Sequence, residues 1–458
     1  MRWAPDAAEH IGAWMQINIQ ACHFLHLAKQ QPRVVYVTKS CLALERKYAM
    51  TATADRYNAP HRLHLETTSY CNFRCEHCYA MSSTDGAHYP IDDLVNVLGR
   101  AGAAGVKKIT LTGGEIFTHP DWKQIISRSL DVCDNVYFIT NGALLDKEKL
   151  HWLARERSMR TIKNWFVRGK FKPVEIGIAI SLDGLEGHGA VRKNAAGVPV
   201  DYRETLDRIR LASRYGLRVT VNTTITNAQS ASELSKMYET LSNIKIDRWQ
   251  IDQAYLFGRY AESALSRGDL SWIDVAKPHF AHIVKDYLKK YPKMPPWRME
   301  IVQVFRHDIL HFGFEPLDSL DAHPCSYHFG SLIIEGGKNV MFCPSLRVSP
   351  IGDLFSSSTI SRIFESDIFQ EFSSKSVNDL PCKACRYGKL FHGGCRANAL
   401  SYNNQMWDCD PVCCSLSPFV EDEIIPLLPK ALQRSFIDAM NGSWRPDGKI
   451  DLPRPPHA

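Results

Sequence analysis

The chain has 458 residues, of which 45% are hydrophobic and 23% are charged, a balance typical of globular proteins. Its net charge of +6 is spread along the sequence, so charge alone does not indicate a protein that binds nucleic acid. No apolar run has the length of a secretory signal core or of a membrane span, so we expect a cytoplasmic protein with neither a membrane partner nor a nucleic-acid partner.

Residues 1–60 are expected to form a helical N-terminal segment, with helices over 11–29 and 38–49. The stretch IGAWMQINIQACHFLHLAKQ (11–30) is interrupted by Gln, Asn and His. The interruptions favour a helix that packs on the domain over one that crosses a bilayer.

Residues 61–255 alternate short β-branched runs with longer segments of helical period. This alternation predicts an α/β fold with parallel strands and right-handed crossovers. Six units are visible rather than eight, so we expect a partial (β/α)6 barrel of the TIM type. The expected strands are 62–68, 107–112, 135–140, 175–181, 217–223 and 248–252, and the expected helices are 91–104, 120–132, 146–165, 202–215 and 231–242.

Special residues follow strand after strand in this region. They are CNFRCEHCY (71–79), GGE (113–115), NG (141–142), SLDG (181–184) and the segment 222–224. Each alone is compatible with an ordinary turn. In parallel α/β folds, however, functional groups gather just past the carboxyl ends of the strands, so the set predicts a site at that rim.

The remaining chain is expected to contain three parts. Residues 256–320 are predicted to be a helical bridge, and residues 321–420 a small cysteine-rich domain held together by bound metal groups. Residues 421–458 are predicted to be a C-terminal helix and a flexible tail that ends in LPRPPHA.

The chain has 14 cysteines, most of them in two groups. In a long chain without a signal peptide this distribution indicates metal or cluster ligation in a reducing compartment rather than disulfides. Cys22, Cys41 and Cys133 stand apart in apolar contexts and receive no role.

The first group places Cys71, Cys75 and Cys78 within eight residues, with no further cysteine nearby. Soft thiolates select zinc, copper(I) or iron–sulfur clusters. Zinc sites take four ligands, commonly from two separated knuckles, and His77 is too close to Cys78 to join it easily on one ion. Three thiolates on a four-iron cluster would instead leave one iron open to a small molecule.

This spacing, CxxxCxxC followed by Tyr79, resembles the signature of radical S-adenosylmethionine (radical SAM) enzymes. The resemblance runs from about residue 62 to about residue 255. It includes TGGEIFTHPDW (112–122), ITNG (139–142) and SLDG followed by His188 and Arg192.

The resemblance implies that the three cysteines hold a 4Fe-4S cluster and that S-adenosylmethionine (AdoMet) chelates the open iron. It implies cleavage of AdoMet to methionine and a 5′-deoxyadenosyl radical, with an electron donor such as a flavodoxin or a ferredoxin. Gly113, Gly114 and Glu115 would receive the amino group. The other implied cofactor contacts are Tyr79, Asn141, Ser181 and Asp183.

Residues 325–414 resemble the SPASM extension of these enzymes, which binds auxiliary 4Fe-4S clusters. The resemblance implies Cys325, Cys343 and Cys395 as ligands of one auxiliary cluster and Cys382, Cys385 and Cys413 as ligands of a second. The family has a further cysteine where this chain has Phe391, and Cys409 and Cys414 are the candidates to replace it. A second open iron, a degraded site and a zinc-ribbon-like site remain alternatives, so one or two auxiliary clusters are expected.

SPASM enzymes mostly modify peptides or proteins, so we expect a radical oxidoreductase that cross-links, epimerises or similarly modifies a ribosomal natural-product peptide. Pro344 follows Cys343 where formylglycine-forming members have an aspartate, which argues against that reaction. Radical oxidation or epimerisation of a small molecule such as a carbohydrate is the second hypothesis. A non-catalytic iron–sulfur scaffold is the third. The sequence names no catalytic base.

Overall fold

The computed structural model describes residues 60–169, 171–263, 270–292, 295–312, 316–317, 319–325, 330–346, 350–355 and 360–442. All of them belong to one compact unit, Thr51–Leu452. The helices expected over 11–29 and 38–49, together with Cys22, Cys41 and the tail beyond residue 442, lie outside the described residues.

A single sheet organises the described residues, and its central six strands are parallel. Alternating apolar side chains such as Leu63 and Leu65 are fully buried, because both faces of the strand are covered. The prediction of six strand–helix units is confirmed. The strands are β1 (Arg62–Glu66), β2 (Lys108–Thr112), β3 (Asn135–Thr140), β4 (Glu175–Ser181), β5 (Arg218–Ile225) and β6 (Arg248–Gln253).

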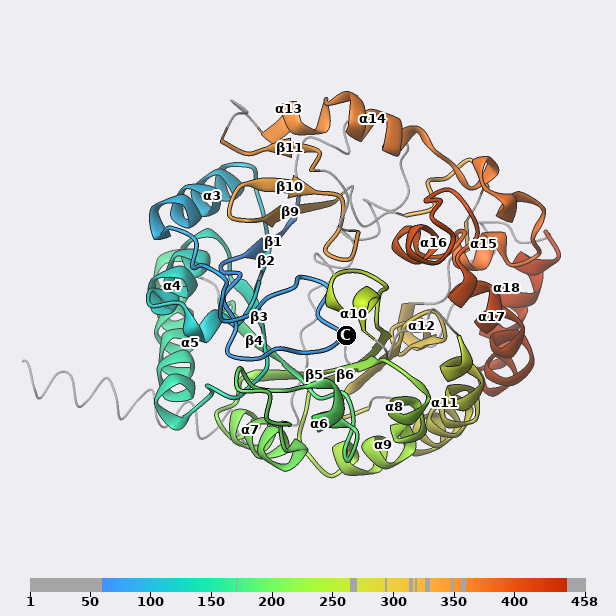
Figure 1. Cartoon of the computed structure of the whole chain (residues 1–458), viewed down its shortest axis with the longest axis horizontal. Coiled ribbons are helices and arrows are strands. Elements are labelled where there is room, and N and C mark those ends of the chain that lie inside the picture. Colours follow the sequence, from blue (N-terminus) through green and yellow to red (C-terminus); the bar gives the residue numbers. More distant parts are fainter. Residues whose placement is uncertain are drawn as a thin grey trace, which may run out of the picture. The chain divides into compact units, whose positions relative to one another are not determined.

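Helices connect these strands and lie on the outer side of the sheet (Figure 1). The side chain of Asp146 accepts a hydrogen bond from the backbone N of Lys149 at 2.8 Å and thereby caps the longest connecting helix. Gly169 ends that helix with φ +64, a conformation that favours glycine. The helices are α3 (Ile91–Ala103), α4 (Trp122–Val132), α5 (Lys147–Arg168), α6 (His188–Val191), α7 (Tyr202–Arg214), α8 (Ala228–Ser232) and α9 (Leu234–Ser242).

Beyond β6 the chain adds strands that the sequence did not predict. Helix α11 (Ser271–Lys290) lies where a helical bridge is expected, but β7 (Arg298–Ile301) then pairs in parallel with β6, and β8 (Phe305–Arg306) pairs antiparallel with β7. The segment 256–320 therefore combines the helices expected there with two short strands of the sheet. β7 is short and alternates charged with apolar residues, so nothing in it resembles the buried runs of the central strands.

The cysteine-rich region shares the same sheet. β9 (Ser331–Glu335) pairs in parallel with β1, and β10 (Asn339–Met341) and β11 (Gly352–Asp353) continue antiparallel from it. Further helices follow, namely α13 (Ile360–Phe364), α14 (Asp367–Ser374), α15 (Gly388–Phe391), α16 (Arg396–Asn403), α17 (Pro411–Phe419) and α18 (Lys430–Met440). No helix among the described residues is long and apolar enough to cross a membrane.

Candidate active site

The loop between β1 and α3 carries the first cysteine group. Cys71 and Cys75 are buried, and Cys78 is half-buried. The backbone N of Glu76 donates to the carbonyl of Val191 at 2.9 Å, which ties the loop to the end of α6. All cysteines in the described part of the chain are free of disulfides. The three thiols are thus fixed by the surrounding backbone and remain available as ligands.

Two glycines let the loop approach the strand ends closely. A Cβ at Gly114 would lie 1.9 Å from the carbonyl oxygen of Tyr70. Gly258, just after β6, has φ +56, and a Cβ there would lie 2.4 Å from the carbonyl oxygen of Tyr79. Both positions therefore require glycine, and the cysteine loop is packed between the ends of β2 and β6.

Two arginines bring positive charge to the loop. Arg192 Nη1 lies 3.7 Å from Cys75 Sγ. Arg259 Nη1 donates to the carbonyl of Cys75 at 2.6 Å, and its Nη2 donates to the carbonyl of Ser82 at 3.0 Å. Such neighbours favour an anionic group bound by the thiols.

Burial sets the protonation of the cysteines. It raises the pKa of the Cys71 thiol to about 12, although the backbone N–H of Phe73 opposes the shift. It also raises the pKa of Cys75 to about 11, against the charge of Arg192. These groups are neutral thiols at pH 7 and become thiolates when a cation binds, so they fit metal ligation better than a nucleophilic role.

A buried ion pair lies beside the loop. Arg192 Nε donates to Asp183 Oδ2 at 2.5 Å, and His77 Nε2 lies 3.3 Å from the same oxygen. The backbone N of Thr224 donates to Asp183 Oδ1 at 2.9 Å. Burial alone would raise the pKa of Asp183, but Arg192 and then His77 outweigh it and lower the pKa to about 2. Asp183 is therefore an anion that orients Arg192 towards Cys75.

Glu115 of the GGE motif is directed into the protein. Its carboxylate accepts from Thr140 Oγ1 and from the backbone N of Asn141, both at 2.8 Å. Asn141 Nδ2 in turn lies 3.9 Å from Cys71 Sγ. Glu115 thus joins the ends of β2 and β3 and holds Asn141 against the cysteine loop.

The remaining expected cofactor contacts lie on strand ends or in the loop. Ser181 is buried at the end of β4, in register with Asn222 on β5. The side-chain oxygen of Asn222 is buried without a hydrogen-bond partner. Gly113 has φ +124 at the end of β2, and Tyr79 is half-buried in the loop.

In the second cysteine group, three thiols influence one another. Burial and then Cys325 raise the pKa of the Cys343 thiol to about 12. Burial raises the pKa of Cys395 as well, and Asp410, Cys343 and Cys325 raise it further. The structure therefore brings together the three residues expected to serve one auxiliary cluster.

The other thiols of this group form a second set. Cys382 Sγ lies 3.8 Å from Cys409 Sγ. Burial raises the pKa of Cys414 to about 11, with further contributions from Cys409 and Cys385. Cys413 is buried, and its Sγ lies 3.9 Å from Ser417 Oγ. All the expected ligands of a second cluster are thus neighbours, together with Cys409 and Cys414.

Across the described residues, no three His, Cys, Asp or Glu side chains are grouped as ligands of one metal ion. A structural zinc ion needs four ligand atoms at about 2.0–2.3 Å. Two thiolates 3.8 Å apart, such as Cys382 and Cys409, can share one ion, so metal analysis distinguishes zinc from a cluster in this region.

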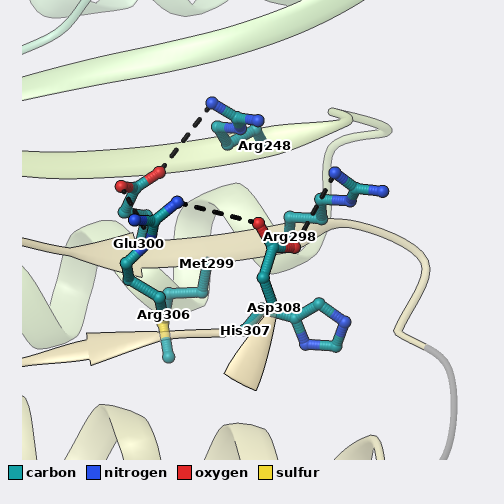
Figure 2. A pocket seen from close by; sticks show the side chains of 7 residues that line it. All are labelled: Arg248, Arg298, Met299, Glu300, Arg306, His307 and Asp308. Atoms are coloured by element: carbon teal, nitrogen blue, oxygen red, sulfur yellow. Dashed lines mark ion pairs between the residues drawn. The ribbon is translucent and has the colours of Figure 1, made fainter. Parts of the chain in front are cut away.

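A small cavity elsewhere is lined by charged residues (Figure 2). Its volume is about 10 Å³, which is room for about one water molecule. Glu300 lies 3.3 Å from Arg306 and 3.8 Å from Arg248, so the charges pair with each other. Arg248 and Arg298 begin β6 and β7, which places the cavity at the strand edge opposite the cysteine loop. This cavity is not a candidate substrate site.

The match to known proteins agrees with this site. Residues 65–241 match the model described as Radical SAM superfamily, and this stretch contains the cysteine loop and the strand-end motifs. Residues 65–241 therefore form a radical SAM domain, as the cysteine spacing and the strand-end motifs predicted.

Three similar proteins illustrate the range of the superfamily. The chain is 24% identical over 377 residues to the PqqA peptide cyclase of Granulibacter bethesdensis, covering 78% of this chain and 88% of that protein. It is 23% identical over 383 residues to the AdoMet-dependent heme synthase of Methanosarcina barkeri, covering 78% and 97%. The structure of SuiB from Streptococcus suis bound to the precursor peptide SuiA has a TM-score of 0.55 at 16% identity over 89% of each chain, which shows a shared fold.

Proposed function

We propose that this enzyme oxidatively modifies a peptide by radical chemistry at the first cysteine loop. The observation that carries the proposal is the set of the buried Cys71 and Cys75 and the half-buried Cys78, which is one thiolate short of a full cluster ligand set and is bordered by polar groups on the strand ends. The peptide substrate is supported by the PqqA peptide cyclase and by SuiB, whose names or titles include a peptide.

The three thiols fit a 4Fe-4S cluster because they are soft and free of disulfides, and because Arg192 and Arg259 bring positive charge to Cys75. When bound there, the cluster supplies the electron that splits AdoMet into methionine and a 5′-deoxyadenosyl radical. A flavodoxin or ferredoxin is the proposed electron donor.

We assign the AdoMet contacts to the strand ends. Gly113 and Gly114 present backbone to the methionine end, with Glu115 as the buried carboxylate behind them. Ser181, Asp183 and Asn141 contact the ribose and carboxylate side, with Tyr79 on the loop. Two observations support this assignment: Asn141 Nδ2 lies 3.9 Å from Cys71 Sγ, and Asp183 orients Arg192, which lies 3.7 Å from Cys75 Sγ.

We propose that Cys325, Cys343 and Cys395 would hold an auxiliary 4Fe-4S cluster, which would supply an electron acceptor for the oxidised substrate. The balance of a cross-link requires such an acceptor. One hydrogen atom goes to the 5′-deoxyadenosyl radical, one proton goes to a base, the new bond forms between the two substrate atoms, and one electron leaves.

Anaerobic reconstitution with iron, sulfide, AdoMet and dithionite tests the radical step. We expect 5′-deoxyadenosine from the wild-type protein and none from the Cys71→Ala, Cys75→Ala, Cys78→Ala variant. A wild-type protein that loads iron but forms no 5′-deoxyadenosine would support the scaffold hypothesis instead.

A small-molecule substrate is the second candidate, favoured by the similarity to the AdoMet-dependent heme synthase. Co-expression with short peptides encoded beside the gene separates the two. A peptide that loses the mass of a hydrogen pair, or that gains deuterium at Cα in heavy water after epimerisation, supports the peptide proposal. Peptides recovered unchanged from an enzyme that cleaves AdoMet favour the small molecule.

A further inference from the structure

The second cysteine set lacks a thiol at one expected position. Phe391 ends α15, and its ring centroid lies 6.5 Å from that of Tyr387. It is half-buried against the apolar core and supplies no donor atom. If these thiols hold a cluster, the missing ligand must come from the segment 409–414.

Cys409 is the thiol that already meets the set. Its Sγ lies 3.8 Å from Cys382 Sγ, and both residues pack on the apolar cluster of Val377 and Leu380. Cys414 is exposed. Its thiol borders Cys409 and Cys385 from the solvent side of the set, whereas Cys409 lies against the buried Cys382.

The backbone around Cys409 is clamped. Asn403 Nδ2 donates to the carbonyl of Cys409 at 2.9 Å, and the backbone N of Cys409 donates to Asp408 Oδ1 at 2.7 Å. The buried Arg396 donates through Nη1 to the carbonyls of Asp408 at 2.8 Å and Met406 at 2.7 Å. Cys409 is therefore presented on a fixed turn.

Close packing brings this turn and Cys382 to one place. Gly393 has φ +78, and a Cβ there would lie 2.5 Å from Leu380 Cδ1 and 3.8 Å from Cys382 Sγ. Gly394 has φ +79, and a Cβ there would lie 2.5 Å from Asp410 Cβ. The two glycines allow the 393–395 turn to fit between Cys382 and the 409–413 segment.

We infer that Cys409 replaces the ligand that Phe391 cannot supply, so that Cys382, Cys385, Cys409 and Cys413 hold a second auxiliary 4Fe-4S cluster and Cys414 lies outside the ligand set. The inference deepens the proposed function, because it rests on auxiliary clusters in this region. The donor set fits the cluster: four soft side chains, none in a disulfide.

Iron counting on the full chain tests the inference. The parent is the Cys71→Ala, Cys75→Ala, Cys78→Ala variant, reconstituted anaerobically with iron and sulfide, in which we expect about eight irons for two remaining four-iron clusters. Adding Cys409→Ala should remove about four irons, and adding Phe391→Cys to that variant should restore them. Adding Cys414→Ala, or Cys133→Ala at a buried cysteine bonded to the carbonyl of Asn135, should leave the count unchanged.

Four results would overturn the inference. The first three are a Cys409→Ala iron count equal to that of the parent, a Cys414→Ala loss as large as that of Cys409→Ala, and zinc in place of iron by metal analysis. A Cys409→Ala loss that Phe391→Cys does not restore would give Cys409 a purely structural role and also overturn it. The parent cannot bind the first cluster, so the count is independent of AdoMet cleavage. If the wild type formed no 5′-deoxyadenosine, the proposed function would be contradicted, but the iron counts would still test the role of Cys409.

Discussion

The two cysteine regions differ in a charged group that lies beside their cysteines. Beside the first loop, Arg192 lies 3.7 Å from Cys75 Sγ and Arg259 donates to the Cys75 carbonyl. In the second region the carboxylate of Asp410 adds to burial in raising the pKa values of Cys395 and Cys413. Positive charge favours the more reduced, more negative state of a bound cluster, and negative charge opposes it. A cluster bound by cysteines in the first region would therefore be easier to reduce than one bound by cysteines in the second.

The regions also differ in their reserve of thiols. The first loop has three thiols, each at a position that the CxxxCxxC spacing requires. The second region has five thiols at the proposed second auxiliary cluster, namely Cys382, Cys385, Cys409, Cys413 and Cys414. Loss of any one thiol should therefore abolish cluster binding in the first region. In the second region, the effect on cluster binding should depend on which thiol is removed.

The largest expected effect is the loss of AdoMet cleavage in Cys75→Ala. Removal of one of three ligands abolishes the site, so 5′-deoxyadenosine should fall to background. Cys414→Ala is the matched change in the second region and should keep the rate within a factor of about two. The measurement is 5′-deoxyadenosine by liquid chromatography. If Cys75→Ala still formed this product, the predicted difference between the two cysteine regions would be wrong.

Arg192→Leu should follow in size. It leaves the buried Asp183 carboxylate without its partner, which costs about 3–5 kcal/mol of unfolding free energy. Urea unfolding of the cluster-free protein measures it, and Arg192→Leu combined with Asp183→Asn should recover part of the loss. The control is Arg218→Leu, which breaks the half-exposed pair with Glu175 and should cost at most about 1 kcal/mol. If Arg192→Leu and Arg218→Leu lost equal free energy of unfolding, the buried Arg192–Asp183 pair would stabilise the protein no more than a half-exposed pair.

Gly258→Ala tests the packing of the loop. Its Cβ would meet the Tyr79 carbonyl at 2.4 Å in a left-handed backbone, so a loss of about 1–3 kcal/mol and weaker AdoMet cleavage are expected. Gly99→Ala is the matched control, because Gly99 is exposed on α3 with nothing within 4 Å and should gain about 0.5–1 kcal/mol. Thermal unfolding measures the stability of both variants, and 5′-deoxyadenosine assays measure their AdoMet cleavage. If Gly258→Ala changed neither, the cysteine loop would not depend on the close packing of Gly258 against the Tyr79 carbonyl.

The smallest effect is expected at the charged cavity of Figure 2. Arg306 is 61% exposed, and its pairs with Glu300 and Asp308 are screened by solvent. Arg306→Ala should cost less than about 1 kcal/mol and leave 5′-deoxyadenosine formation unchanged. A clear loss of AdoMet cleavage would assign this edge of the sheet to the site.

The sequence predicted the central six strands and the five longer helices between them because short apolar, β-branched runs alternate with longer segments of helical period. It missed β7 and β9 because parallel pairing with β6 and β1 depends on partners distant in sequence. Short strands with charged residues give no periodic signal of their own.

The site was predicted in part for the same reason. Local spacing indicated Cys71, Cys75 and Cys78, and the SLDG motif with its following residues indicated Asp183 and Arg192. Arg259 gave no signal, since it contacts Cys75 across 184 residues of chain. The Asp-Pro pair at the start of α17 is a helix-capping pattern, so the sequence could have indicated Asp410 as a cap. The pattern could not indicate its hydrogen bond to the backbone N of Cys395.

The carboxylate of Asp410 has a consequence for how the second region acquires its metal. One oxygen accepts from the backbone N of Cys395 at 2.7 Å, and the other accepts from that of Cys413 at 3.3 Å. Each proposed auxiliary cluster would therefore have one ligand whose main chain is held by the same buried anion. We expect the filling of one set to order that anion for the other, and this coupling would be reciprocal by thermodynamic linkage. Iron uptake by the two sets should therefore be cooperative, with few half-filled molecules along a titration.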